Sequence, residues 1–224
     1  MRLHPVLVTP FLAAALCFCA FPQTPDAKDT QPSEIKGMPP RATAADYQAQ
    51  GQAGAITIAA EFSGHSVPRP DGPLSTEDYV VVETGFFGPQ SDRIKLSIDD
   101  FSLRINGKKN ALPSQPYGLV AHSLKDPSWV APEEAEGKPK SKGGLSTGGN
   151  KGDSDSLPVV IHIPIALQRS MAQYIQKSSL PQGERPLPAA GLLFFEYRGK
   201  TQNLRSIELI YNGPAGKATL SLNP

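Results

Sequence analysis

Short stretches in which apolar and polar residues alternate recur along most of the chain. In residues 55–62, Ile56, Ile58 and Phe62 alternate with polar or small residues, as expected for a strand with one buried face. The same reasoning predicts extended segments at residues 78–87, 94–98, 101–105, 115–124, 158–163, 191–197, 204–211 and 217–222. Residues 192–195 are apolar at every position, which indicates a central strand covered on both faces. Together these short strands favour an antiparallel β-sandwich.

Within residues 94–105, the apolar residues shift from even-numbered to odd-numbered positions. Apolar residues occupy even positions before the pair Asp99-Asp100 and odd positions after it. Since side chains of a strand alternate between two faces, the extra residue predicts a bulge or bend at that pair. Asn106-Gly107 then predicts a tight turn with positive φ, after which Lys108 begins the returning strand.

One segment has the period of a helix instead. Leu167, Met171 and Ile175 are spaced four residues apart, with polar residues on the other faces. Pro164 suits a first helical turn, and Pro181 requires the helix to end before it. We expect one amphipathic helix here.

The N-terminus has the pattern of a secretory signal peptide. A short positive start precedes an apolar run that ends near Ala20, and this run is too short to span a bilayer. We therefore predict a signal peptide at residues 1–20 and a secreted or periplasmic protein. Lipid attachment at Cys19 is the alternative, which would make it an anchored envelope protein. A lipidation site requires a small residue just before the cysteine, and Phe18 at that position is a poor match.

Two segments are predicted to lack a fold of their own. Residues 21–50 are rich in polar residues and proline and are predicted to be mostly disordered, apart from a short helical turn opened by Thr43. Residues 126–157 are charged and rich in Gly and Ser and read as a long disordered, low-complexity insertion. The predicted domain is 51–224, interrupted by that insertion.

Composition narrows the possible functions. The formal net charge is +1, which gives no reason to expect a nucleic-acid partner. Membrane association would depend on the lipid at Cys19. Cys17 and Cys19 are the two cysteines and fall within the signal peptide, so we predict neither a disulfide nor a thiol nucleophile in the mature chain.

Three motifs resemble those of a known family. They are "DYVVVETGFFGP", "DDFSLRINGKK" and "LPQGERPLPAAGLLFFEYRG". Together they resemble a family of bacterial secreted immunoglobulin-like domains of unknown function, over roughly residues 75–222. The insertion and the helix depart from the simple pattern of that family. The resemblance implies an immunoglobulin-like β-sandwich and supplies no catalytic residue.

Residues with reactive side chains have simpler interpretations. Ser146 in "GLSTG" matches a nucleophile motif but lacks the flanking strand and helix that the motif needs. His65, His122 and His162 have no partner at metal-ligand spacing. The acids considered as an acid/base pair or calcium site are Asp99, Asp100, Glu83 and Glu208, together with those of "GDSDS" (152–156). We predict no catalytic, metal or cofactor site.

The remaining candidates concern binding. The basic clusters "KPKSK" (138–142), "GKK" (107–109) and "RGK" (198–200) are read as solvated turns, with binding of an anionic cell-wall polymer as the alternative. Tyr117 and Trp129 flank loops and are the tentative partner-binding residues. The leading hypothesis is a secreted, non-enzymatic module that binds a protein or an envelope component. Carbohydrate or cell-wall-polymer binding is the alternative, and an unrecognised hydrolase is third.

Overall fold

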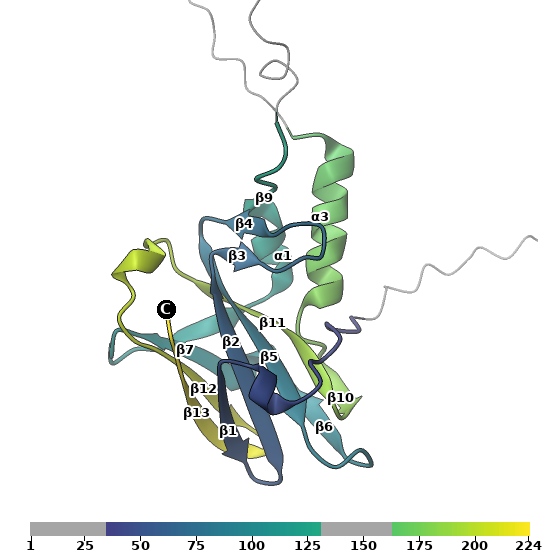
Figure 1. Ribbon diagram of the computed structural model, residues 1–224, viewed down its shortest axis with the longest axis vertical. Helices are drawn as coiled ribbons and strands as arrows, with labels where there is room; N and C mark the ends of the chain where they lie inside the picture. The colour runs from purple at the N-terminus through teal and green to yellow at the C-terminus, as the bar shows by residue number, and fades with distance from the viewer. Residues whose placement is uncertain (1–34, 131–162) are drawn as a thin grey trace, which may run out of the picture. The chain divides into compact units, whose positions relative to one another are not determined.

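The computed structural model describes residues 35–130 and 163–224 (Figure 1). The predicted signal peptide, the strand predicted at 158–163 and residues 131–157 of the predicted insertion fall outside these residues, apart from Ile163. The described chain is mainly β, and its strands pair antiparallel. The prediction of a mainly β, antiparallel fold is confirmed.

The described strands follow in chain order. They are β1 (Ala49–Ala53), β2 (Ile56–Gly64), β3 (Ser66–Val67), β4 (Leu74–Thr76), β5 (Tyr79–Phe87), β6 (Arg93–Leu96), β7 (Phe101–Ile105), β8 (Leu112–Gln115), β9 (Leu124–Lys125), β10 (Gly183–Pro186), β11 (Ala189–Glu196), β12 (Ile207–Gly213) and β13 (Gly216–Leu222). The helices are α1 (Tyr117–Val120) and α3 (Ile165–Ser178), with 3-10 turns at Ala44–Asp46, Ile98–Asp100, Ala121–Ser123 and Thr201–Asn203.

Eight strands form one sheet, in the order β1-β2-β5-β11-β8-β7-β12-β13. Its two outer strands approach each other, since a Cβ added to Gly51 in β1 would lie 3.4 Å from Cδ1 of Leu220 in β13. The sheet therefore curls into a nearly closed barrel (Figure 1). Strands β3, β4 and β9 form a small second sheet, and β6 pairs with β10.

Strand β11 separates two hydrophobic cores. Leu193 and Phe195 point into the barrel, whereas Leu192 and Phe194 point outward to a second core. That second core lies between the sheet and a layer made of α1, α3, β3, β4 and β9, which gather beside one end of the sheet in Figure 1. The strand predicted from residues 192–195 is confirmed as central and covered on both faces.

Helix α3 agrees with its predicted period. Met171 and Ile175 are 2 % and 0 % exposed, and the partly buried Leu167 packs with them in the second core. Pro164 caps the helix, which ends at Ser178, before Pro181. Among the described residues, neither helix is long and apolar enough to cross a lipid bilayer.

The bend and turn predicted near residue 100 are present. Asp99 and Asp100 belong to a 3-10 turn, in which the Ser97 hydroxyl accepts a hydrogen bond from the Asp99 amide at 3.2 Å. Asn106 and Gly107 have φ values of 52° and 65°. The predicted start of the returning strand is wrong, since the strand begins at Leu112 and not at Lys108.

The extended segment predicted at residues 115–124 is mostly helical. Pro116 caps α1, and a 3-10 turn continues it to Ser123. The second core takes up Tyr117, Val120 and Leu124, whose spacing of three and four residues is helical. The prediction of an extended segment here is wrong, because the buried side chains follow the period of a helix.

The predicted disorder of residues 21–50 is wrong for residues 35–50. Tyr47 is 6 % exposed, and the Met38 amide donates to the Ala190 carbonyl at 3.1 Å. The predicted turn after Thr43 is confirmed as a 3-10 turn. Residues 126–130 are likewise ordered, because Asp126 pairs with Arg69. Residues 21–34 fall outside the described chain.

Candidate functional site

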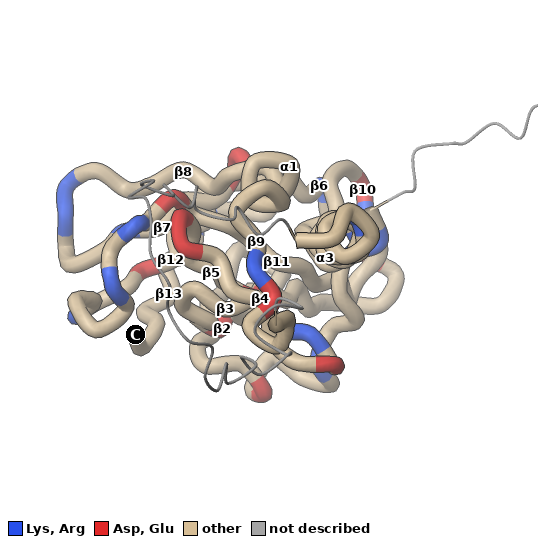
Figure 2. The backbone as a smooth tube through the Cα atoms, turned by 90° about the horizontal axis from the view of Figure 1, so that it is seen from above, with Lys and Arg blue, Asp and Glu red and all other residues tan. Residues whose placement is uncertain are grey.

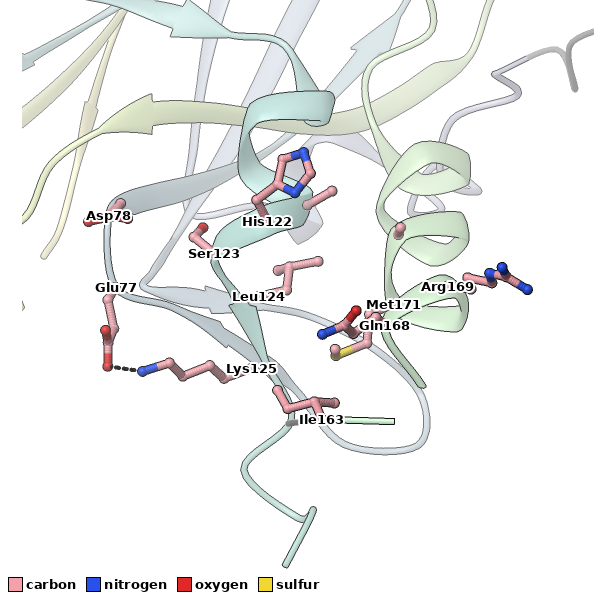
Figure 3. Close-up of a pocket in the computed structure, with 12 residues that line it drawn as sticks. Glu77, Asp78, His122, Ser123, Leu124, Lys125, Ile163, Gln168, Arg169 and Met171 are labelled. Carbon is pink, nitrogen blue, oxygen red and sulfur yellow. Dashed lines mark hydrogen bonds and ion pairs between the residues drawn. The ribbon is translucent and has the colours of Figure 1, made fainter. Parts of the chain in front are cut away.

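A groove lies between helix α3 and the segment that runs from the 3-10 turn Ala121–Ser123 into β9 (Figure 3). It encloses about 540 Å³, within the range of ligand-binding clefts. Its lining residues are Glu77, Asp78, Ala121, His122, Ser123, Leu124, Lys125, Ile163, Gln168, Arg169, Met171 and Ala172.

The groove combines an apolar floor with a charged rim. Leu124 and Met171 are 5 % and 2 % exposed and form part of the second core. At the rim, the Lys125 ammonium lies 2.6 Å from the Glu77 carboxylate. Figure 3 shows Gln168 and Met171 on the side of α3 that faces Leu124, with Arg169 directed away from it. The rim therefore carries both signs of charge and no strong net field.

Strand β9 has an open edge at this groove. It pairs on one side with β4, where Ser75 opposes Lys125 and Thr76 opposes Leu124. No described strand pairs with its other side. An open strand edge presents backbone donors and acceptors to a further strand.

Three large apolar side chains are exposed among the described residues, and none of them lines the groove. They are Leu119 on α1, Val130 after β9 and Ile165 at the start of α3, and they are 52 %, 55 % and 67 % exposed.

A serine, a histidine and an aspartate also line the groove without forming a relay. The Ser123 hydroxyl donates to the Val120 carbonyl at 2.9 Å and lies 3.0 Å from the Thr76 hydroxyl. No described hydrogen bond joins it to His122, and Asp78 pairs with Arg198 at 3.2 Å. Nucleophilic catalysis needs the hydroxyl to contact its base, so this trio gives no support to a hydrolase.

Asp126 fixes the chain just beyond β9. Its carboxylate accepts hydrogen bonds from the amide and hydroxyl of Ser128 at 2.9 and 2.5 Å and lies 3.2 Å from Arg69. The bonds from Ser128 and the Arg69 charge lower the pKa of Asp126, because they favour the ionised form. These contacts attach the chain after β9 to the connection between β3 and β4.

The two aromatic residues predicted to bind a partner do not share a cavity among the described residues. Tyr117 lies on α1, half-buried against the second core, and borders a small hollow with Ile35 and Leu180. Trp129 is half-buried, and its amide donates to the Asp126 carbonyl at 3.1 Å. Both are near the groove in sequence, but neither lines it. Their role in binding stays a prediction.

The other histidines and the basic clusters have separate positions. Both ring nitrogens of His65 lie 2.8 Å from carbonyl oxygens, those of Tyr79 and Gly199, so this side chain links the connection between β2 and β3 to the start of β5 and to the loop after β11. Ser146, His162, residues 138–142 and residues 152–156 fall outside the described chain. Within the described residues, no three His, Cys, Asp or Glu side chains are placed to hold a metal ion.

Glu83 and Glu208, considered as acid/base candidates, form ion pairs instead. Arg104 lies 2.8 Å from Glu208. Glu83 is 8 % exposed at its side chain and receives two hydrogen bonds from Arg41, from Nε at 3.1 Å and from Nη2 at 2.9 Å. Arg41 also pairs with Glu61, the cross-strand neighbour of Glu83.

Arg41 is a structurally important residue that was not among the candidates selected from the sequence. It lies in a segment predicted to be disordered, and its guanidinium stacks 4.6 Å from the ring centre of Tyr47. The hydrogen bonds to Glu83 raise the pKa of Arg41, and burial raises the pKa of Tyr47. The available signal was a glutamate in each of two successive predicted strands, Glu61 and Glu83, because like charges that come to lie opposite each other need a cation.

Comparisons with protein-family models, characterised proteins and solved structures found no match to this chain.

Proposed function

We propose that this protein is a secreted, non-enzymatic β-domain that binds an extended peptide segment of a partner protein in the α3–β9 groove. The observation that supports this best is the open edge of β9 beside an apolar floor. A peptide added to such an edge gains main-chain hydrogen bonds, and a pocket beside it selects alternate side chains.

The lining of the groove indicates the chemistry of the peptide. Leu124 and Met171 would contact an apolar side chain, while the Glu77–Lys125 pair and Gln168 would meet polar groups beside it. Because the rim carries both signs of charge, a strongly charged ligand gains little there. Among the described residues, no Phe, Tyr or Trp lines this groove, which gives no support to stacking of a sugar ring there.

We also propose the class and location inferred from the sequence. The motifs in residues 75–222 support a relationship with secreted immunoglobulin-like domains, in which the nearly closed sheet would be a variant of the sandwich. The N-terminal pattern supports export to the periplasm or the exterior, or anchoring through Cys19. N-terminal sequencing and intact mass of the protein made with its own leader would test this: an uncleaved chain would contradict export by a signal peptide.

Peptide binding can be tested with displayed random peptides of about ten residues, a length that covers a short added strand. We expect the full-length protein to select peptides that contain an apolar residue. Methylating alternate backbone amides in a selected peptide should abolish binding in one register and leave it nearly unchanged in the other, because alternate amides of a strand point in opposite directions.

Two matched variants locate the site on the protein. Gln168→Trp should fill the groove and weaken peptide binding at least tenfold. Gln173→Trp places the same side chain on an exposed position of α3 that does not line the groove, and it should bind like wild type. Equal binding by both variants, or insensitivity to amide methylation, would contradict the proposal.

A further inference from the structure

Two basic loops that are remote in sequence meet at the end of the barrel formed by β7 and β12. One is the turn after β7, with Lys108 and Lys109, and the other is residues 197–206, with Arg198, Lys200 and Arg205. Figure 2 shows several of the blue backbone segments on the side of the molecule where β7, β12 and β13 lie. These are the sequence clusters "GKK" and "RGK", which nothing in the sequence connects.

Asn106 joins the two loops. Its side-chain oxygen accepts hydrogen bonds from the amides of Arg205 and Ser206 at 2.6 and 3.3 Å, and its side-chain nitrogen donates to the Asn203 carbonyl at 3.0 Å. Its own amide donates to the Ser206 carbonyl at 2.8 Å. The basic residues are therefore held on a common scaffold and not on independent turns.

The positive charge of this end is compensated by described acids at Arg198 alone among its five basic residues. Arg198 pairs with Asp78 and Glu196. The side chains of Lys108, Lys109, Lys200 and Arg205 are exposed and have no described acid within ion-pair distance. Since the whole chain has a formal net charge of only +1, this concentration results from placement and not from composition.

Two hollows open at the same place. One, of about 510 Å³, has Lys108, Asn110 and the Arg198–Glu196 pair among its polar lining and Leu112 among its apolar lining. The other, of about 620 Å³, is lined by Asn106, Gln202, Asn203, Arg205 and Ser206. The second set is rich in amide and hydroxyl groups, which can both donate and accept hydrogen bonds.

We infer that this end of the barrel binds an acidic polysaccharide that carries carboxylates along its length. The cations would meet the carboxylates, Gln202, Asn203 and Ser206 would bond the sugar hydroxyls, and Leu112 would contact an apolar sugar face. The site is separate from the peptide groove and does not depend on it. No exposed row of aromatic side chains is present in these two loops, which disfavours single-stranded nucleic acid.

The test uses the full-length protein and three polymers: polygalacturonate, uncharged dextran of similar length, and polyphosphate. We expect binding to polygalacturonate that weakens with added salt, with at least tenfold weaker binding to dextran and to polyphosphate. Equal or stronger binding to polyphosphate would show a general anion surface and overturn the assignment to a polysaccharide. Equal binding to dextran, or none to polygalacturonate, would also overturn it.

Two matched triple variants test whether polygalacturonate binding depends on these loops or on the overall net charge. The first replaces Lys108, Lys109 and Lys200 by Gln, and the second replaces the exposed Lys95, Lys177 and Lys217 by Gln. We expect at least a tenfold loss of polygalacturonate binding in the first variant and less than a twofold change in the second. Equal losses would mean that overall charge governs binding and would overturn the inference.

Asn106→Ala provides a test of the scaffold. It retains every basic side chain but removes the side-chain hydrogen bonds between the loops, and we expect a threefold or greater loss of polygalacturonate binding. Unchanged binding by this variant, with its fold intact by circular dichroism, would overturn the role of Asn106. Gln168→Trp should leave polygalacturonate binding unchanged, which keeps this inference distinct from the peptide groove.

Discussion

The guanidinium of Arg41 donates two parallel hydrogen bonds to the carboxylate of Glu83, at 3.1 and 2.9 Å. Glu83 lies in the middle of β5 opposite Glu61 in β2, so the two strands place like charges side by side. Arg41 contacts both carboxylates and thereby attaches residues 35–47 to the outer face of the sheet. The segment before β1 is part of the folded domain because of this cluster.

Replacing Arg41 by Ala should destabilise the protein by about 2–3 kcal/mol. The change leaves the nearly buried Glu83 carboxylate without its partner, although Arg41 itself is 31 % exposed at its side chain and water offsets part of the loss. Urea denaturation at pH 7 would measure this change in the free energy of unfolding.

The matched control is Arg104→Ala. Arg104 pairs with Glu208 at 2.8 Å, but both side chains are more than a third exposed, at 37 % and 35 %. We expect a loss below about 1 kcal/mol. A loss as large as that of Arg41→Ala would contradict the role given to burial of Glu83.

Gly191→Ala should destabilise the protein by about 2 kcal/mol or more, as an overpacked core does. A Cβ at this position in β11 would lie 2.4 Å from the Leu180 Cα atom and 2.6 Å from its nitrogen, and backbone cannot rotate away. Gly118→Ala is the control, since nothing lies within 4 Å of its added Cβ. Thermal unfolding should show a large loss for the first and no loss for the second.

Phe194→Ala and Phe195→Ala should each cost about 3–5 kcal/mol but act on different cores. Phe194 packs with Met171 and Ile175 of α3, whereas Phe195 lies inside the barrel. Amide hydrogen exchange should show selective loss of protection in α3 for Phe194→Ala. Equal loss in α3 for both variants, at matched global stability, would refute the separation of the cores.

Asp126 should make stability fall in acid. Because its pKa in the folded protein is lowered from 3.8, the unfolded chain takes up its proton first as the pH falls. The stability it contributes is present above about pH 4 and is lost as the pH falls through the folded-state pKa. Asp126→Asn should lower stability at pH 7 and flatten the dependence on pH below about 4, as measured by urea denaturation from pH 2 to 7.

Asp100 should have the opposite dependence. Burial, and then the charge of Asp99, raise the pKa of Asp100 above 3.8, so the folded protein binds its proton more readily than the unfolded chain. Asp100→Asn should therefore stabilise the protein at pH 7, and this gain should disappear as the pH falls through the folded-state pKa. A gain that persists unchanged at pH 3 would contradict this assignment.

Local pattern predicted much of the fold. The alternation in residues 55–62 and 78–87, the spacing of Met171 and Ile175, and the continuous apolar run in β11 each report directly which side chains are buried. Residues 115–124 were assigned to the wrong element because four apolar positions over ten residues fit either period. These residues become buried by packing against α3, and this tertiary contact favours the helical period over the period of a strand.

The sites could not be predicted in the same way. The α3–β9 groove brings together residues 77 and 168, and Asn106 contacts residues 203–206. Such neighbours depend on strand order, which period alone does not determine. Tyr117 and Trp129 were selected by residue type and proximity to loops, and residue type does not indicate whether a side chain lines a cavity.

Because β11 contributes side chains to both cores, neither layer can be removed without exposing an apolar surface of the other. The barrel and the layer around α3 should consequently melt together, in one calorimetric transition whose enthalpy agrees with the van't Hoff value. A partner that binds α3 would then raise the melting temperature of the whole domain, including the strands far from α3.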